Sequence, residues 1–399
     1  MGLAGCGPLG VVWGKFVTGI ASAVRRNVSL DSVRGLAALA VLLGHAYSIV
    51  PGAPQHLGGQ HHLADLLNPL MLIKATPLRA IINGHAAVMV FFVLSGFVLR
   101  STFLGARTAY WPFFRQRLAR LWLPCAFAIL VGAALYWLLG SSSGGSIQAF
   151  FTHDIWQAPI TAPRIGAALA VSGRGGDLMM DPPLWSLDHE IRISLIFPLI
   201  ALLVSRRPLA WLAGAAVLHV ICLKASPNIY AANLVASLLQ SGAYLVFFVL
   251  GFVVADQWRR AEQVVARLGK VGQAVALIVA LLTFALPMGL FVSDLCYGLA
   301  AAVLLALVAH ADWVARPLKV APIVWLGRVS FSLYLTHLIV FAGVLRLVYG
   351  PLGLNPNLGA MVVLLIPIAL CVAEMTYRLV ETPSKILSHR LASPRPAAA

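Results

Sequence analysis

The stretch LDSVRGLAALAVLLGHAYSIV, Leu30 to Val50, is the first long apolar run of the chain and carries polar residues in its interior. Arg34 and His45 are eleven positions apart in it. Because a helix turns by about 100° per residue, both side chains lie on one face, about 16 Å apart along the axis. A charge at mid-bilayer costs about 2.5–3.5 kcal/mol. The pair therefore predicts a polar cavity inside a bundle of membrane helices.

The composition predicts an all-α, multi-pass membrane protein. Of the 399 residues, 60% are hydrophobic and only 11% are charged, whereas a soluble domain carries about 25% charged residues. Apolar runs of about 20 residues, long enough to cross a bilayer as a helix, recur along the chain. We predict about ten transmembrane helices, near Leu30–Val50, Ile82–Ser101, Leu118–Leu139, Trp185–Val204, Leu209–Leu223, Leu234–Ala255, Val271–Leu286, Leu290–His310, Leu326–Val348 and Leu358–Thr376.

Basic residues set the predicted orientation. Of the 29 Lys and Arg residues, 21 fall on the side that holds both chain ends and six on the other side. Because basic residues concentrate in cytoplasmic loops, both termini are predicted to be cytoplasmic. The net charge of +16 is thereby explained by topology. No pattern typical of nucleic-acid binding is present, so nucleic acid is not expected as a partner.

Three segments are expected along the chain: an N-terminal extension over 1–29, a membrane domain over 30–383 and a disordered C-terminal tail over 384–399. The five cysteines form no CxxC pair, which argues against a disulfide framework or a zinc site. No HExxH motif or Walker loop occurs, and no metal is expected. No consistent metal-ligand spacing links His56, His61 and His62.

His45 and Arg34 are the first candidates for catalysis. A neutral imidazole inside a bundle can act as a general base, and a guanidinium on the same face can hold an anionic substrate. Asp31 lies one turn before Arg34 and is expected to pair with it. The alternative for His45 is a structural histidine that bonds to a neighbouring backbone carbonyl.

The stretch FFVLSGFVLR, Phe91 to Arg100, places Ser95 beside Gly96. Two interpretations remain open. Ser95 can be a nucleophile, although no base is adjacent in the sequence, or the two small residues can let another helix approach closely. Helix packing is the more economical interpretation of the motif.

The stretch FRQRLARLWLP, Phe114 to Pro124, brings Arg115, Arg117 and Arg120 to the predicted inner membrane boundary. Guanidinium groups bind phosphates through paired hydrogen bonds. The three arginines therefore suit a phosphorylated ligand, while ordinary positive-inside charge is the alternative.

Glu190 and Tyr334 mark two further candidate stretches. PPLWSLDHEIR, Pro182 to Arg192, carries Glu190 into an apolar run, where a carboxylate can orient a histidine or bind a sugar hydroxyl. LGRVSFSLYLTHLIV, Leu326 to Val340, places Tyr334 and His337 on neighbouring helix positions, with packing and local hydrogen bonds as the alternative. Near the end of the last span, structural ion pairs are expected for Glu374 and Glu381.

Together these motifs resemble the acyltransferase 3 family of bacterial integral-membrane acyltransferases. The resemblance covers residues 29–383 and is carried by LDSVRGLAALAVLLGHA, FFVLSGFVL, RQRLARLWLP, PLWSLDHEI, LGRVSFSLYLTH and the ETP at Glu381–Pro383. One departure is Ser32-Val33, where the family commonly has Gly-Leu. No stretch resembles the SGNH-type hydrolase domain that some members carry.

The resemblance implies transfer of an acyl group, usually acetyl, from cytoplasmic acyl-CoA to a hydroxyl of a carbohydrate or glycolipid at the bacterial inner membrane. Acyl-CoA is then a co-substrate, and the acceptor and the lipid bilayer are the expected partners. Residue roles are expected to divide among catalysis by His45, Arg34 and Glu190, donor binding by Arg115, Arg117 and Arg120, and substrate binding by Trp185, Ser95, Tyr334 and His337.

A second functional class is transport, because intramembrane Arg, His and Glu residues also suit a substrate path. An exporter or permease for a polysaccharide or lipid is therefore the alternative function. No inverted repeat is detectable in the sequence, and the resemblance favours transfer. The acceptor, the acyl group and the oligomeric state are not defined by the sequence.

Overall fold

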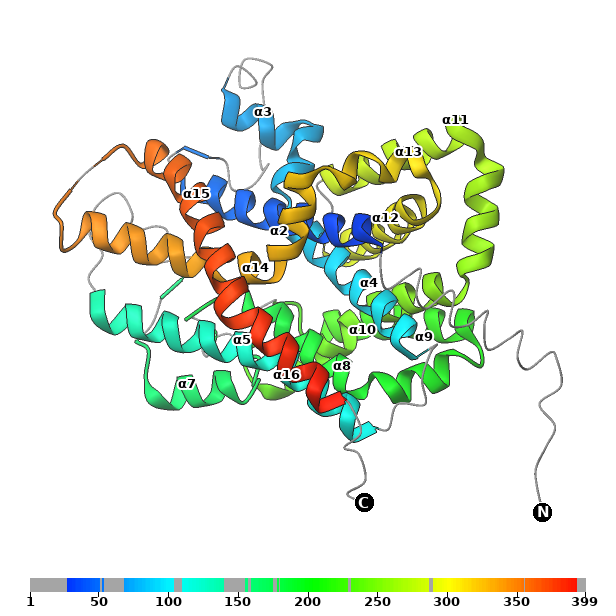
Figure 1. The fold of residues 1–399 in the computed structure, drawn as a ribbon, viewed down its shortest axis with the longest axis horizontal. Helices are drawn as coiled ribbons and strands as arrows, with labels where there is room; N and C mark the ends of the chain where they lie inside the picture. Colours follow the sequence, from blue (N-terminus) through cyan, green and yellow to red (C-terminus); the bar gives the residue numbers. More distant parts are fainter. Residues whose placement is uncertain are drawn as a thin grey trace.

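The computed structural model describes residues 27–50, 52–53, 68–103, 110–139, 155–156, 159–174, 178, 180–228, 231–286, 290–354 and 356–392. These residues are mainly helical and contain no β-strand, so the predicted all-α class is confirmed. The long helices (Figure 1) are α2 (Val28–Ile49), α4 (Gly84–Phe103), α5 (Tyr110–Leu139), α8 (Leu184–Val204), α9 (Pro208–Ala225), α10 (Leu234–Asp256), α11 (Trp258–Ala285), α12 (Leu290–His310), α14 (Ala321–Tyr349), α15 (Leu358–Thr376) and α16 (Thr382–Ala392). The shorter elements are α3 (Pro69–Ala75), η2 (Pro77–Ile82), α7 (Ala162–Leu169), α13 (Asp312–Ala315), η5 (Pro317–Lys319) and the π-helical turn η6 (Tyr377–Glu381).

Eight helices among the described residues are long and apolar enough to cross a membrane, which makes this a multi-pass membrane protein. The apolar part of α4, Gly84–Arg100, is shorter. Helix α8 is long enough but carries Asp188, Glu190 and Arg192 in its first half. The count of ten spans and the cytoplasmic placement of the termini stay predictions.

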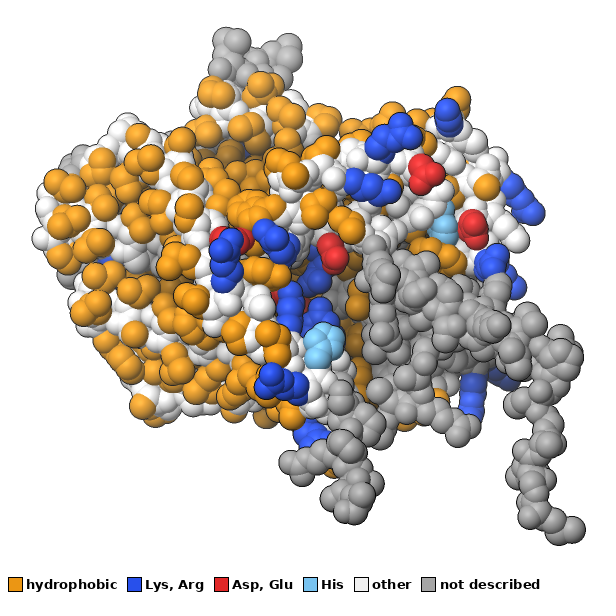
Figure 2. All heavy atoms as spheres, viewed as in Figure 1, with side chains coloured by type: hydrophobic (Ala, Val, Ile, Leu, Met, Phe, Trp, Pro, Cys, Tyr) orange, Lys and Arg blue, Asp and Glu red, His pale blue; other side chains and the backbone are white. Residues whose placement is uncertain are grey.

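The outer surface of the bundle is strongly apolar, as expected where helices face lipid. Figure 2 shows hydrophobic side chains over much of the visible face, most densely on the left of the view. Leu209 on α9 and Val271 on α11 are 72% and 79% exposed. The interior, in contrast, contains buried polar and charged side chains as well as apolar ones. Some polar and charged side chains therefore lie inside the bundle and not at its surface.

Helices α2 and α14 cross in close contact at two glycines. A Cβ atom on Gly327 would lie 2.5 Å from the carbonyl oxygen of Asp31, and one on Gly35 would overlap the backbone of Gly327. The hydroxyl of Ser32 donates to the carbonyl of Leu318 at 2.7 Å and ties the start of α2 to the segment before α14. The absence of side chains at this crossing fixes α2 in the middle of the bundle (Figure 1).

Helices α4 and α10 meet in the same way. A Cβ atom on Gly96 would overlap the carbonyl of Phe248, and one on Gly251 would overlap the carbonyl of Val93. The prediction that the small residues of the FFVLSGF motif serve close helix packing is confirmed at Gly96.

Several helices extend beyond the apolar runs that predicted them. Helix α5 begins at Tyr110, eight residues before the predicted Leu118, because its arginine-containing segment is helical without being apolar. Helix α11 begins at Trp258 and is kinked at Gly269, where φ is +59°. Glycine adopts this left-handed conformation readily, so the chain can bend at this position. The kink lies between the charged first half of the helix and its apolar second half.

The C-terminal segment differs from the disordered tail expected over 384–399. Residues up to Ala392 form helix α16, while the rest of that segment, like nearly all of the predicted extension 1–29, lies outside the described residues. The hydroxyl of Ser384 donates to the carbonyl of Ala119 at 2.5 Å, and Lys385 pairs with Glu381 at 2.6 Å. These contacts dock a segment that hydropathy alone does not identify.

The structural ion pairs expected for Glu374 and Glu381 are present. Glu374 pairs with Arg378 at 2.6 Å and accepts a hydrogen bond from the Trp325 indole at 2.8 Å. Glu381 is 3% exposed and accepts from the hydroxyl of Ser332 at 2.6 Å in addition to its pair with Lys385. Both carboxylates therefore tie the end of α15 to α14.

The glycine crossings predict a position-specific stability effect. Gly96→Ala is expected to lower the free energy of unfolding by about 1–3 kcal/mol, because its methyl group would overlap the Phe248 backbone. Gly214→Ala, on the exposed face of α9 with no atom within 4 Å of the new methyl group, is expected to leave stability unchanged or slightly higher. Thermal unfolding in detergent, followed by size-exclusion profile, measures both; equal melting temperatures for the two variants would contradict this account of the crossing.

Candidate functional site

Two neighbouring cavities lie inside the bundle between α2, α4, α8 and α14. The first, called the Arg34 cavity, has a volume of about 20 Å³ and is lined by Arg34, Phe91, Phe92, Ser95, Ser186, Leu187, Glu190, Ser330, Phe331 and Tyr334. The second, called the His45 cavity, has a volume of about 310 Å³ and is lined by Val41, Gly44, His45, Ser48, Ile82, Gly84, His85, Val88, Pro182, Pro183, Trp185 and Tyr334.

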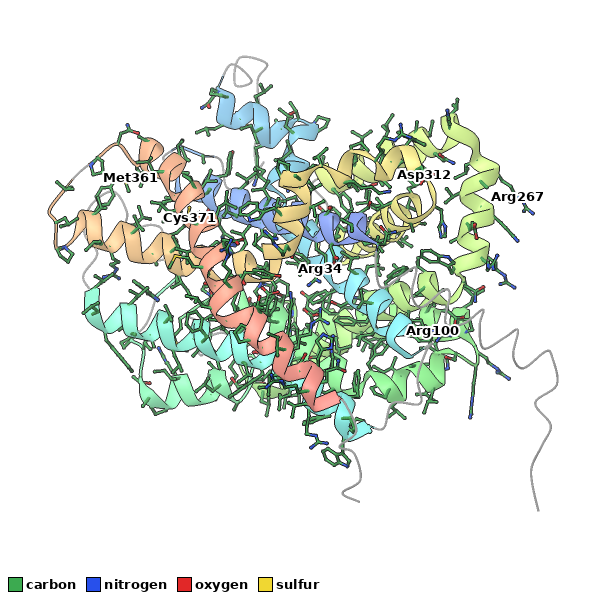
Figure 3. The ribbon with its side chains drawn as sticks, in the orientation of Figure 1. Arg34, Arg100, Arg267, Asp312, Met361 and Cys371 are labelled. Carbon is green, nitrogen blue, oxygen red and sulfur yellow. The ribbon has the colours of Figure 1, made fainter. Side chains whose placement is uncertain are left out.

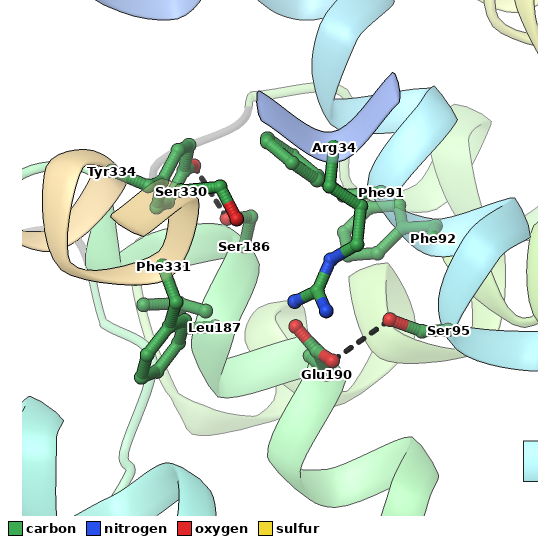
Figure 4. A pocket seen from close by; sticks show the side chains of 10 residues that line it. All are labelled: Arg34, Phe91, Phe92, Ser95, Ser186, Leu187, Glu190, Ser330, Phe331 and Tyr334. Atoms are coloured by element: carbon green, nitrogen blue, oxygen red, sulfur yellow. Dashed lines mark hydrogen bonds between the residues drawn. The ribbon is translucent and has the colours of Figure 1, made fainter. Parts of the chain in front are cut away.

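Charged and polar groups meet in the Arg34 cavity. Figure 4 shows the Arg34 guanidinium directed toward the carboxylate of Glu190, which comes from α8. The hydroxyl of Ser95 on α4 donates to Glu190 Oε1 at 2.8 Å. The structure thus brings three sequence candidates from three helices to one point. Arg34 lies in the middle of the bundle, whereas Arg267 projects from its periphery (Figure 3).

Asp31 does not pair with Arg34 as expected. Its side chain is exposed while the Arg34 side chain is partly buried, and no ion pair joins the two. Because Arg34 is directed toward Glu190, the carboxylate that faces its guanidinium comes from another helix and not from the preceding turn.

Arg117 and Arg120 extend the positive charge of the Arg34 cavity onto α5. Arg117 is only 9% exposed and donates through Nη2 to the hydroxyl of Ser194 at 2.8 Å. Both arginines interact electrostatically with Arg34 and with Glu190. We call Arg34, Arg117 and Arg120 the arginine cluster. A buried guanidinium is not an ordinary surface charge, so topology alone does not account for Arg117.

Arg115 stands apart from the arginine cluster. Its side chain is exposed near the start of α5, two residues before the buried Arg117. The three arginines predicted to act together therefore divide into one at the surface and two that reach inward.

His45 lines the second cavity and contacts another imidazole. Its ring centroid lies 5.3 Å from that of His337. The ring of His45 makes no hydrogen bond to a described residue, so the backbone carbonyl that the structural alternative requires is not found among the described residues. An imidazole that faces a cavity and has no partner among the described residues can use its nitrogens to bind a ligand.

His337 is fully buried and lines neither of the two cavities. Its Nδ1 is close to the carbonyl oxygens of Leu333 and Tyr334, at 3.1 and 2.9 Å. Because carbonyls only accept, Nδ1 carries the proton and Nε2 is left as an acceptor without a partner. The local hydrogen bonds expected as the alternative for His337 are present, and they fix the ring beside His45.

Tyr334 belongs to the lining of both cavities and separates them. Its hydroxyl oxygen lies 2.6 Å from Ser186 Oγ and 3.2 Å from the carbonyl oxygen of Pro183. Trp185, the neighbour of Ser186, lines the His45 cavity. The substrate-binding candidates Ser95, Tyr334 and Trp185 are thus all cavity residues.

Sequence reasoning missed one pair in the His45 cavity. His85 Nε2 lies 2.5 Å from Asp294 Oδ1, although the residues are 209 positions apart. No local motif joins them; the one available signal was an aspartate near the start of the apolar run 290–310. Asp181 directly precedes the lining residues Pro182 and Pro183 in the chain, and burial raises the pKa of its carboxyl well above its ordinary value.

The described residues contain no group of three or more His, Cys, Asp or Glu side chains that could hold a metal ion. His56, His61 and His62 lie outside them. Cys125, Cys222, Cys296 and Cys371 are free thiols. The described residues that line the two cavities offer imidazole, guanidinium, carboxylate and hydroxyl groups.

Comparison with known proteins points to one family. A family model described as an acyltransferase domain, the acyltransferase 3 family, matches residues 27–374. The chain is also similar to Acyltransferase MdmB of Streptomyces mycarofaciens, with 28% identity over 390 residues that cover 90% of this chain and 92% of that protein. No solved structure matches significantly. The chain therefore belongs to the acyltransferase 3 family and is a multi-pass membrane enzyme that transfers acyl groups.

Proposed function

We propose that this enzyme is an O-acyltransferase of the bacterial inner membrane. It moves an acyl group, in the simplest case acetyl, from cytoplasmic acyl-CoA to a hydroxyl of a carbohydrate or glycolipid such as O-antigen or exopolysaccharide. The observation that carries the proposal is that the Arg34 cavity and the His45 cavity adjoin at Tyr334. Displacement of the Tyr334 side chain would therefore open a route from a cluster of guanidinium groups to the imidazole of His45 within the bundle.

The arginine cluster provides the donor end of the route. Coenzyme A carries several phosphate charges, and guanidinium groups bind phosphates through paired hydrogen bonds. Arg117 and Arg120 lie within electrostatic reach of Arg34, and the exposed Arg115 is placed to make a first contact. Glu190 balances part of this positive charge and keeps Arg34 directed into the cavity.

His45 provides the proton acceptor at the other end. The acceptor oxygen attacks the thioester carbonyl carbon while its hydroxyl proton passes to the imidazole. The C–S bond then breaks, the sulfur leaves as the thiolate of CoA, and the proton on His45 passes to that thiolate. General base catalysis of this kind contributes about 10²- to 10⁴-fold in rate. Arg34 lies about 16 Å from His45 along the axis of α2, so its part in the proposal is to anchor the donor and not to contact the reacting carbonyl.

Donor entry requires side-chain movement. A cavity of about 20 Å³ has room for about one water molecule, not for a pantetheine arm. The Tyr334–Ser186 hydrogen bond of 2.6 Å closes the passage between the two cavities. Rotation of Tyr334 toward the His45 cavity, which is larger, would join them. Transport is the less favoured function, because the chain belongs to a family that transfers acyl groups.

The role of His45 predicts a large, selective loss of activity. His45→Ala is expected to insert normally and to lower acetyl transfer about 10²- to 10⁴-fold, because no other group in the proposal takes the hydroxyl proton. The measurement is incorporation of labelled acetyl from acetyl-CoA into native membranes of a strain that lacks the wild-type gene. His389→Ala, on the exposed face of α16, is the control. Acetylation near the wild-type level in the His45 variant would remove this residue from the mechanism.

The role of the arginine cluster predicts a change mainly in the KM for the acyl donor. Arg117→Ala and Arg120→Ala are expected to raise the KM for acetyl-CoA about 10-fold or more, because each removes charge-assisted phosphate contacts, with less change in the KM for the acceptor. Arg206→Ala removes a charge at the exposed end of α8 and serves as the matched control. An unchanged donor KM in both cluster variants would assign these arginines to topology and packing.

A further inference from the structure

A histidine–carboxylate pair forms part of the wall of the His45 cavity and has no role in the chemistry described above. His85 is in the first turn of α4, and Asp294 is near the start of α12. His85 Nε2 and Asp294 Oδ1 are 2.5 Å apart, with the His85 side chain 25% exposed and the Asp294 side chain fully buried. His85, and not Asp294, lines the cavity.

Asp294 loses hydration free energy because its carboxylate is buried, and the pair with His85 recovers little of that free energy for the stability of the fold. Its second oxygen, Oδ2, has no hydrogen-bond partner, and a buried ion pair often contributes no more stability than apolar side chains of similar size. What the pair does achieve is orientation. Asp294 Oδ1 accepts a hydrogen bond from the Nε2–H group of His85, which leaves Nδ1 as a hydrogen-bond acceptor without a described partner.

Trp185 completes this part of the cavity wall. Its ring and that of His85 are nearly parallel, with an interplanar angle of 15° and centroids 6.5 Å apart. Behind them, Tyr297 meets His85 edge-on at 6.4 Å. The flat face of Trp185, which lines the cavity beside the oriented acceptor of His85, suits a ring that carries hydroxyl groups. The volume of about 310 Å³ is at the lower end of the range for small-molecule sites.

His85 and His45 face the same cavity because their helices approach closely. A Cβ atom on Gly44 would lie 2.6 Å from the carbonyl oxygen of Ile82, and one on Gly84 would lie 3.5 Å from the Cα atom of Val41. Each histidine directly follows one of these glycines in the sequence. The crossing of α2 with the start of α4 therefore holds the two imidazoles on one ligand space.

We propose that His85, oriented by Asp294, binds a second hydroxyl of the acceptor beside the hydroxyl that His45 deprotonates. The second hydroxyl donates its hydrogen bond to His85 Nδ1, and no covalent step involves His85. This inference rests on the proposed acyl transfer and narrows the acceptor class to molecules with two neighbouring hydroxyls, such as a sugar ring. A lipid alcohol with one hydroxyl would leave His85 without its partner.

The test uses variants that keep the fold. In the double variant His85→Phe/Asp294→Leu, the flat ring beside Trp185 is retained and no unpaired buried carboxylate remains. Labelled acetyl incorporation from acetyl-CoA into native membranes is expected to fall about 10- to 100-fold, as for loss of a strong hydrogen bond. The thermal stabilisation of the purified variant by CoA is expected to match that of the wild type, because the donor binds elsewhere.

A conservative variant and a matched control distinguish binding from structure. His85→Gln keeps a donor for Asp294 and an acceptor for the cavity. This variant is therefore expected to show most of the acetyl incorporation that the double variant loses. His310→Phe replaces a histidine at the other end of α12, packed on Trp258 at 4.2 Å, and is expected to behave as wild type.

Three results would overturn the inference: incorporation within twofold of wild type in the double variant, simultaneous loss of the CoA-induced stabilisation, or a His85→Gln variant as inactive as the double variant. Absence of incorporation by the wild type would instead overturn the proposed function on which the inference depends.

Discussion

Charge held inside an apolar helix bundle is the constraint on which the other features of this enzyme depend. A guanidinium or carboxylate in a membrane interior costs several kcal/mol unless partners and polar space accompany it. Glu190 meets this requirement through Ser95 and the facing Arg34, and Arg117 meets it through Ser194. These groups come from four helices, so the bundle must pack in one arrangement to satisfy them, and that arrangement encloses the cavities in which acyl transfer is proposed.

Backbone contact at glycines makes the arrangement possible. The α2–α14 crossing at Gly35 and the α4–α10 crossing at Gly96 leave no room for a side chain. Helices that approach this closely place Arg34 and His45 of α2 against α4, α8 and α14. Tyr334 then stands between a small cationic cavity and a larger one lined by His45. The same packing that stabilises the fold therefore separates the donor end of the proposed route from the acceptor end.

Local periodicity predicted much of the fold and the central residues of the site. The apolar run at 290–310 coincides with α12, and the eleven-residue spacing in α2 placed Arg34 and His45 toward neighbouring cavities. Hydropathy missed the arginine-containing start of α5 and all of α16, because these helices are stabilised by contacts such as Ser384 with Ala119. The His85–Asp294 pair was also missed, since it joins residues far apart in the chain through the packing of α4 on α12. The prediction that Asp31 pairs with Arg34 was wrong for the same reason, because the carboxylate that faces Arg34 belongs to Glu190 on a different helix.

The central claim is that the acyl donor passes from the arginine cluster to His45 within the bundle. Electron cryo-microscopy of the enzyme in nanodiscs with a non-hydrolysable thioether analogue of acetyl-CoA tests it most directly. The account predicts phosphate density against Arg117 and Arg120, a displaced Tyr334 side chain, and the acetyl carbonyl inside the His45 cavity. Analogue density that enters elsewhere, with Tyr334 still bonded to Ser186, would contradict it.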